Sequence, residues 1–194
     1  MFDMSDRQRL VSSSEDIIDH LVRYNVIKFG TFVGKSGETY SVETDIRAAY
    51  TKQVVAHETT KKIFDVLDEN GLGDLPYIGV PETGTFIANY LNNIFFFKKQ
   101  KNFSPNMLRA SPKTYQSETD SVYAVLPVDR NQEYSLIEDD VVTGNTLIKY
   151  LQSALNAGLK IKNVITIFSR SSANAVIEFC ESKKINHFEI ITIM

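Results

Sequence analysis

The sequence predicts an α/β domain whose core is a doubly wound, mainly parallel sheet. Short apolar segments typical of strands alternate along the chain with segments whose apolar residues recur at helical spacing. Such alternation is typical of parallel sheets covered by helices. A length of 194 residues suits one domain. Because no internal repeat or low-complexity linker marks a boundary, we treat residues 1–194 as a single domain.

The composition is that of a globular protein in water, and it excludes several classes of function. Hydrophobic residues make up 43% of the chain, and the net charge of -3 gives no basis for non-specific nucleic-acid binding. No apolar run is long enough to span a membrane, and no signal-peptide pattern stands at the N-terminus. The single cysteine, Cys180, excludes an internal disulfide. We expect a cytoplasmic protein that contacts neither membrane nor nucleic acid.

The first part of the chain is expected to form a helix, a strand pair and a second helix. Ser12 and Glu15 form a capping-box pattern, and the apolar residues that follow recur at helical spacing. Residues 26–47 alternate and carry three glycines, which predicts two short strands joined by a glycine turn. A helix is predicted over residues 48–69, because Asn70 and two glycines follow it.

The rest of the chain continues the alternation of strands and helices. Strands are predicted at residues 77–80, 107–109, 121–128, 133–137, 164–168 and 187–193. Helices are predicted from the turn at residues 81–85 through Leu91, and over residues 145–156 and 171–183. The run Phe95 to Phe97 is expected in the core, and the polar residues 110–120 in a mobile loop. Ligands of parallel sheets bind at the carboxyl ends of the strands.

The strand before residue 138 leads into the most informative turn. Three carboxylates and a run of small residues open a helix there: Glu138, Asp139, Asp140, Val142, Thr143, Gly144, Asn145 and Thr146. The first N–H groups of a helix have no internal partner, and the helix dipole favours an anion. Carboxylates beside such a phosphate cradle suit sugar hydroxyls or Mg²⁺. The stretch predicts a sugar-phosphate site, although Asn and Thr also serve as ordinary caps.

This stretch resembles the phosphoribosyl pyrophosphate motif of the type I phosphoribosyltransferases, in which a hydrophobic strand leads into two acids, two hydrophobic residues, Thr or Ser, Gly and Thr. Two registers fit the motif. Without a gap, Glu138 and Asp139 are the acid pair, and Asp140 replaces an apolar residue. With a one-residue deletion, the pair is Asp139 and Asp140. Asp139 belongs to the pair in both registers.

Further segments resemble the orotate phosphoribosyltransferases within that family. Residues 26–37 are similar to their N-terminal segment, and this resemblance implies that Lys35 reaches the phosphoribosyl donor. Residues 80–85 match their pyrophosphate loop, which assigns Glu82 and Thr83 to substrate binding. Successive backbone N–H groups in a turn of small residues form a nest for anions.

A flexible catalytic loop and a base-binding arginine are also implied by this resemblance. Residues 108–116 are similar to the family's catalytic loop, with Arg109, Lys113 and Tyr115 at matching positions. Arg170 ends a strand where the family has an arginine that pairs with the carboxylate of orotate. A planar guanidinium suits a planar anion.

The resemblance implies a type I phosphoribosyltransferase fold with residues 1–47 as an N-terminal hood, and a homodimer. It implies the transfer of phosphoribose from phosphoribosyl pyrophosphate to orotate, giving orotidine monophosphate and pyrophosphate. Glu138 and Asp139 would hold the ribose hydroxyls, and Lys113 with Arg109 would neutralise the pyrophosphate. Mg²⁺ would be the cofactor, carried mainly by the oxygens of the donor rather than by a metal site of the protein.

The base is the least determined part of this interpretation. Glu43 and Thr44 stand where the family usually places an aromatic residue, so a phosphoribosyltransferase for another base is an alternative, with Tyr40 as a substitute aromatic. A charge-assisted bidentate pair at Arg170 contributes about 1.5–3 kcal/mol. One repulsion from Glu43 costs less near a surface, where the effective dielectric constant is about 20. Orotate is therefore the expected base.

A protein of a different class also fits part of the pattern. Ala110 stands where a lysine that contacts pyrophosphate is usual, and Asp140 is irregular in the motif. These two departures favour a non-catalytic regulator that binds the sugar phosphate.

Overall fold

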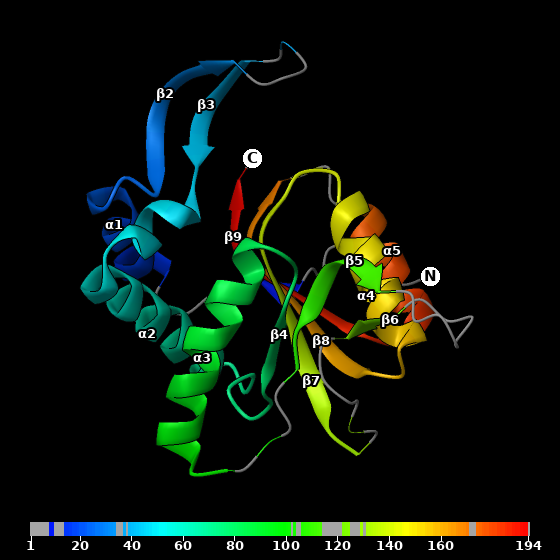
Figure 1. Ribbon diagram of the computed structural model, residues 1–194. Coiled ribbons are helices and arrows are strands. Elements are labelled where there is room, and N and C mark those ends of the chain that lie inside the picture. The colour runs from blue at the N-terminus through cyan, green and yellow to red at the C-terminus, as the bar shows by residue number, and fades with distance from the viewer. Residues whose placement is uncertain are drawn as a thin grey trace.

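The computed structural model describes residues 8–9, 14–33, 37, 39–101, 103, 106–113, 122–124, 129, 131–170 and 174–193. Its centre is a five-stranded sheet of order β1-β9-β8-β7-β4 in which every neighbouring pair is parallel. The strands are β1 (Gln8–Arg9), β4 (Tyr77–Gly79), β7 (Glu133–Val141), β8 (Lys160–Arg170) and β9 (Asn186–Ile193) (Figure 1). The predicted parallel sheet is confirmed.

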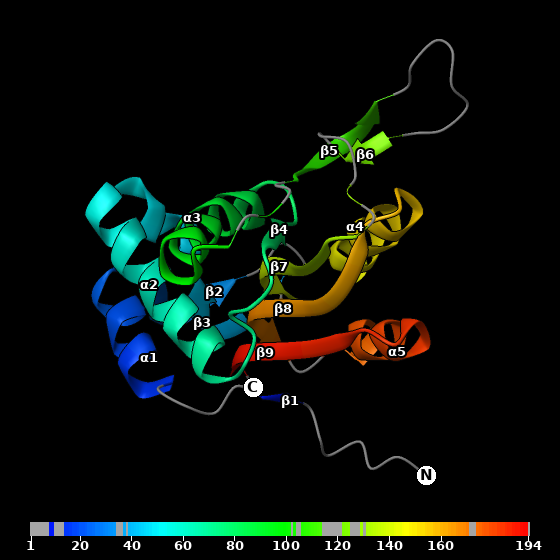
Figure 2. The same ribbon diagram turned by 90° about the horizontal axis from the view of Figure 1, so that it is seen from below.

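Helices cover both faces of this sheet, as Figures 1 and 2 show. On one side lie α1 (Ser14–Arg23), α2 (Gln53–Glu69) and α3 (Thr83–Lys99), and on the other α4 (Asn145–Asn156) and α5 (Asn174–Lys183). The side chains of Ile165 and Ile167 pack in the core between the sheet and α1, α2 and α3. The side chain of Val164 packs in the core between the sheet and α4 and α5. The strands predicted at residues 133–137 and 164–168 lie within β7 and β8, whose central residues are apolar and buried on both faces; both strands extend beyond the predicted ranges.

An antiparallel hairpin stands at the carboxyl edge of the sheet (Figure 1). It consists of β2 (Ile27–Val33) and β3 (Thr39–Thr44), and a 3-10 helix, η1 (Ile46–Thr51), follows it. Burial alternates along β3, so that Tyr40, Val42 and Thr44 share the less exposed face. This period of two is that of a strand with one covered face, and it confirms the predicted strand pair.

A second pair of strands projects from the body (Figure 2). It is formed by β5 (Leu108–Lys113) and β6 (Val122–Ala124), which pair in antiparallel fashion, and β6 lies against α4. The predicted strand over residues 107–109 is therefore too short, because pairing with β6 extends it to Lys113. Residues 114–120 of the expected loop lie outside the described residues.

Several predicted boundaries are wrong for tertiary reasons. The helix expected over residues 48–69 is divided at Lys52, whose backbone is extended (φ -130°, ψ 128°), into η1 and α2. Helix α3 runs past Leu91 to Lys99, and Gln100 in the left-handed conformation (φ +52°) ends it. Of the phenylalanines at its end, Phe95 is buried but Phe97 is 71% exposed. The carboxylates expected after a strand instead lie within β7, whose pairing with β8 continues to Val141.

Strand β4, α3 and β7 approach one another at the level of their backbones. A Cβ atom on Gly79 would lie 2.0 Å from the carbonyl atoms of Gly84, and one on Gly84 would lie 2.6 Å from the carbonyl oxygen of Ile137. Both positions therefore require glycine. The side chain of Asn92 on α3 also bonds both backbone groups of Tyr77, at 2.7 and 2.8 Å, and so satisfies the free edge of β4.

The peptide bond between Pro81 and Glu82, in the turn from β4 to α3, is cis. Within the described ranges, no helix is both long enough and apolar enough to cross a membrane.

Candidate active site

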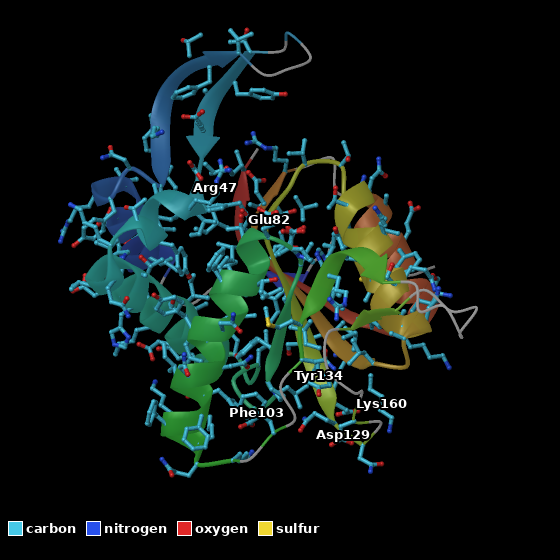
Figure 3. The ribbon with its side chains drawn as sticks, viewed as in Figure 1. Arg47, Glu82, Phe103, Asp129, Tyr134 and Lys160 are labelled. Carbon is cyan, nitrogen blue, oxygen red and sulfur yellow. The ribbon has the colours of Figure 1, made fainter. Side chains whose placement is uncertain are left out.

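Polar turns of several elements gather at the carboxyl edge of the sheet, below the β2–β3 hairpin. In Figure 3, Arg47 of η1 and Glu82 at the start of α3 lie near this edge, whereas Tyr134 and Asp129 lie at the opposite end of β7. The ends of β4, β7 and β8 are the positions where a doubly wound sheet binds its ligands. The described part of the chain therefore places a candidate site where the sequence predicts one.

The turn from β7 to α4, which we call the phosphate loop (residues 142–146), lines a cavity of about 160 Å³ together with strand residues. The lining residues are Glu138, Asp140, Val141, Val142, Thr143, Gly144, Thr146 and Leu147. Asn145 begins α4, so the loop ends at a helix N-terminus, which favours an anion. Gly144 has φ +83°, and a Cβ atom there would lie 2.2 Å from Cγ2 of Val176. The loop can therefore turn here only with glycine.

Glu138 is buried in this cavity, with 6% of its surface exposed. Burial, followed by the hydrogen bond and charge of Asp139, raises the pKa of Glu138 to about 9. The backbone N–H of Asp139 donates to Oε1 of Glu138 at 3.1 Å. Near neutral pH the Glu138 carboxyl is therefore protonated, and it can donate one hydrogen bond as well as accept. A sugar hydroxyl suits such a group.

Asp140 joins the sheet to the hairpin. Oγ1 of Thr44 donates to Oδ2 of Asp140 at 2.5 Å, and Nη2 of Arg170 lies 3.8 Å from the same oxygen. Burial raises the pKa of Asp140, while the Thr44 hydrogen bond and the charge of Arg170 act in the opposite direction. The guanidinium carbon of Arg170 lies 5.2 Å from the ring centre of Tyr40. We call Tyr40, Thr44, Asp140 and Arg170 the base-side cluster.

Glu43 does not face this cluster. It lies on the more exposed face of β3, and its carboxylate pairs with Nζ of Lys28 on β2 at 3.2 Å. Side chains of successive strand residues point to opposite faces, so Tyr40 and Thr44 face inward while Glu43 faces away. The expectation that Glu43 repels an anionic base is therefore wrong, whereas Tyr40 is available as the aromatic residue of this site.

Among the residues that the structure describes, no three His, Cys, Asp or Glu side chains are arranged to hold a metal ion. The carboxyl groups of Glu138 and Asp140 line the same cavity, and Asp139 is only partly buried beside them. Magnesium commonly uses one or two carboxylates together with substrate phosphates and water. Because the Glu138 carboxyl is protonated near neutral pH, the described carboxyl groups fit a Mg²⁺ ion that is held mainly by substrate oxygens rather than by the protein.

No model of a known protein family matches the sequence. Over 176 residues, which are 91% of this chain and 95% of the relative, the chain is 22% identical to an orotate phosphoribosyltransferase of Picrophilus torridus. The structure of this chain resembles that of Francisella tularensis orotate phosphoribosyltransferase with a TM-score of 0.70, at 14% identity over 91% of this chain and 85% of that chain. The chain has the type I phosphoribosyltransferase fold.

The Mycobacterium tuberculosis orotate phosphoribosyltransferase in complex with 5-phospho-α-D-ribosyl 1-diphosphate (PRPP) has the same fold. It shares 14% identity and a TM-score of 0.60 with this chain, over 92% of this chain and 95% of that one. The resemblance to orotate phosphoribosyltransferases that the sequence predicts is confirmed, and the fold class with it.

The other predicted site residues of this phosphoribosyltransferase fold are placed as follows. Glu82 and Thr83 stand at the start of α3, and Glu82 is exposed. Arg109 lies on β5, and its Nε is buried without a hydrogen-bond partner among the described residues. Lys113 ends β5, where only its backbone is described. Lys35 and Tyr115 lie outside the described residues, so their predicted roles stay predictions.

One buried polar group near Arg170 has no counterpart in our sequence interpretation. Glu189 on β9 is 2% exposed, and it accepts hydrogen bonds from Ser169 Oγ at 2.7 Å and Thr192 Oγ1 at 3.0 Å. Buried carboxyl groups are normally paired in this way. The signal that could have revealed it is a lone glutamate between the apolar residues Phe188 and Ile190 of a strand. Ser169 precedes Arg170, so this network fixes the end of β8.

Proposed function

We propose that this chain is an orotate phosphoribosyltransferase, which transfers the phosphoribosyl group of PRPP to orotate and yields orotidine monophosphate and pyrophosphate. The observation that carries the proposal is the cavity that Glu138 shares with the phosphate loop. A ribose 5-phosphate needs a hydroxyl-binding carboxyl group and a phosphate-binding helix N-terminus in the same place. The orotate phosphoribosyltransferases to which the chain is similar, one of them in complex with PRPP, support the choice of donor and base.

The reaction breaks the bond between ribose C1 and the pyrophosphate oxygen and forms a bond from C1 to N1 of orotate, which loses its N1 proton. Positive charge develops on the ribose ring and negative charge on the leaving group, so catalysis is positioning and electrostatic stabilisation. We assign Asp139 to the positive charge on the ring. Glu138, which is protonated near neutral pH, holds a ribose hydroxyl instead of supplying charge.

The pyrophosphate end of the donor would meet the turn at Glu82 and Thr83, together with Arg109 and Lys113. Thr83 begins α3, whose N-terminus favours an anion. A Mg²⁺ ion held chiefly by donor oxygens would supply positive charge to the leaving group. At the other end, the carboxylate of orotate would accept hydrogen bonds from Arg170, against the ring of Tyr40.

A second candidate is the transfer of phosphoribose to an uncharged base. It is favoured by the position of Asp140, whose carboxylate stands 3.8 Å from the guanidinium that orotate would use. The two candidates differ in the base alone, because both use the same phosphate loop and the same donor.

We also propose a homodimer. Phe86 and Phe97 on α3 are 60% and 71% exposed, and they are separated by eleven positions, which places them on one face of the helix. Large exposed apolar side chains on one face of a helix offer a surface that a second copy of the chain would cover. Light scattering should show a dimer that Phe86→Ser with Phe97→Ser dissociates, while substitution of the single exposed Val54 on α2 does not. A monomeric wild-type chain would refute this assembly. We also propose a cytoplasmic location.

The deciding experiment measures pyrophosphate release from PRPP with a panel of bases, with and without Mg²⁺. We expect release that depends on orotate and on Mg²⁺. Release with uracil but not with orotate would support the second candidate. Binding of PRPP without release for any base would leave a non-catalytic regulator.

Lys113→Ala should lower kcat far more than it weakens PRPP binding, because a catalytic loop acts mainly after closure.

A further inference from the structure

The base-side cluster leaves one donor and one acceptor without partners. Nε of Arg170 and Oδ1 of Asp140 are both buried, and neither forms a hydrogen bond with any residue that the structure describes. Buried polar groups are normally hydrogen-bonded, because an unpaired one loses its interactions with water and gains nothing in return. These two atoms are therefore the unfinished part of the cluster.

The geometry shows that the interaction missing from the cluster is a two-bond pairing of Arg170 with a carboxylate. An arginine and a carboxylate pair most strongly as a fork, in which Nε and Nη2 each donate to one carboxylate oxygen. Here Nη2 of Arg170 and Oδ2 of Asp140 are 3.8 Å apart, which is too long for a hydrogen bond, and the other two atoms have no partner among the described residues. Asp140 thus stands in front of the fork of Arg170 without closing on it.

Thr44 accounts for this half-open arrangement. Its hydroxyl donates to Oδ2 of Asp140 at 2.5 Å, so the oxygen that would approach Arg170 is held toward β3. The ring of Tyr40, on the same face of β3, packs against the guanidinium of Arg170 and limits its movement. The carboxylate and the guanidinium are each held by the hairpin rather than by each other.

We propose that Asp140 determines whether the site prefers a carboxylated or an uncharged base, by competing with the ligand's carboxylate for the guanidinium of Arg170, and that Thr44 positions Asp140 for this role. The inference rests on the function proposed above. A carboxylated base must take the two donors that Asp140 faces, and it leaves Asp140 buried beside a second anion. The side chains of Arg170 and Asp140 are only 19% and 25% exposed, so water screens this repulsion weakly. An uncharged base meets no such opposition.

Two nucleotides that differ by one carboxylate provide the test. Orotidine monophosphate and uridine monophosphate share ribose, phosphate and pyrimidine ring, so the ratio of their Kd values cancels the contribution of the phosphate loop. We expect Asp140→Asn, measured by calorimetry on the full chain, to raise the preference for orotidine monophosphate by on the order of tenfold, or about 1.4 kcal/mol. Asp140→Val, which places an apolar residue here as in the usual motif, is a second variant with the same expected sign.

Thr44→Val is expected to change the ratio in the opposite direction. Valine keeps the shape of threonine but has no hydroxyl, so Asp140 is free to close the fork on Arg170. The preference for orotidine monophosphate should then fall below that of the wild-type chain. A structural role alone would weaken the binding of both nucleotides together, without moving their ratio.

Two control variants separate competition at Arg170 from a general change in charge. Glu43→Gln removes the same charge from the opposite face of β3, where Glu43 pairs with Lys28, and should leave the ratio unchanged. In an Arg170→Ala background the competition for the guanidinium is gone and only the direct repulsion remains, so Asp140→Asn should raise the preference by less than it does in the wild-type background.

The outcomes distinguish this inference from the proposed function. An unchanged or reduced preference in both Asp140 variants, or an equal rise in Glu43→Gln, overturns the role of Asp140 while the wild-type chain still transfers phosphoribose. If the wild-type chain binds neither nucleotide and releases no pyrophosphate with any base, the proposed function fails and the role of Asp140 fails with it.

Discussion

The two ends of the candidate site are built in different ways. The phosphate end consists of Glu138, Asp139 and the phosphate loop (residues 142–146), where a strand turns into a helix around Gly144. Asp140, in the same stretch of chain, belongs to the base end. The base end is assembled from β3, β7 and β8, and its central contact joins Thr44 and Asp140 across 96 positions of sequence. Backbone geometry shapes the first and side-chain chemistry the second. The difference suggests that the class of reaction resides at the rigid end and the choice of base at the adjustable end.

The largest effect is expected where the backbone of the phosphate end is disturbed. Gly144→Ala places a Cβ atom 2.2 Å from Val176 at a φ of +83°, whereas Gly158→Ala has the same φ and open space around it. A left-handed alanine costs about 1–2 kcal/mol, and overpacking adds about 1–3 kcal/mol at Gly144 alone. Urea unfolding of both variants measures the difference. Equal losses of unfolding free energy in the two variants would mean that the side chain of Val176 moves aside, and that the loop is less rigid than its contacts imply.

The buried carboxyl of the phosphate end should make stability depend on pH. Glu138 releases its proton near its ordinary pKa of 4.5 when unfolded but only near pH 9 when folded. Between these values the folded chain holds the additional proton, so raising the pH destabilises it, by about 1.4 kcal/mol per pH unit at most. Glu138→Gln removes this dependence. From pH 5.5 to 7.5, the unfolding free energy of Glu138→Gln should therefore rise relative to that of the wild-type chain. A difference that stays constant with pH would contradict the burial of a neutral Glu138.

A third prediction concerns the ribose that both ends share. Asp139→Asn should reduce kcat at least ~10-fold, or about 1.4 kcal/mol of transition-state stabilisation, without a matching loss in unfolding free energy. Because the charge on the ribose does not depend on the base, the factor should be the same for every base that is turned over. A loss restricted to one base would move Asp139 from the phosphate end of the comparison to the base end.

The smallest effect is expected at the base end. Tyr40→Leu removes the aromatic ring above Arg170, a contact that contributes about 0.5–1 kcal/mol at a partly exposed site. Nucleotide binding should weaken about two- to fivefold, while PRPP binding and the unfolding free energy stay close to those of the wild-type chain. If PRPP binding falls by the same factor, the two ends are coupled and the comparison between them fails.

The phosphate end can be predicted from the sequence because it is local. A strand, a turn of small residues and a helix follow one another, and the helix predicted over residues 145–156 coincides with α4. The extent of β7 is not local: it continues through the carboxylates to Val141 only because β8 pairs with it there. The burial that neutralises Glu138 depends on the same tertiary packing.

The base end could not be predicted, since its contacts depend on where the hairpin meets the sheet. The inward direction of Thr44 and the outward direction of Glu43 follow from the register of β3, which pairs Glu43 with Lys28 and contains an irregularity between Phe29 and Phe32. A register one residue different would exchange the two side chains. Neither composition nor periodicity determines that register.

The close approach of β4, α3 and β7 would set the length of donor that the proposed site accepts. Gly79, Gly84 and the carbonyl oxygen of Ile137 meet with no side chain between them, so backbone thickness alone separates the turn at residues 80–85, where we propose that pyrophosphate binds, from the carboxylates of β7. Repacking of side chains cannot change that separation. A donor lengthened by one methylene between ribose and pyrophosphate should therefore be rejected whatever its charge. Neighbouring side chains, in contrast, are free to diverge over evolution while the length of the donor stays constant.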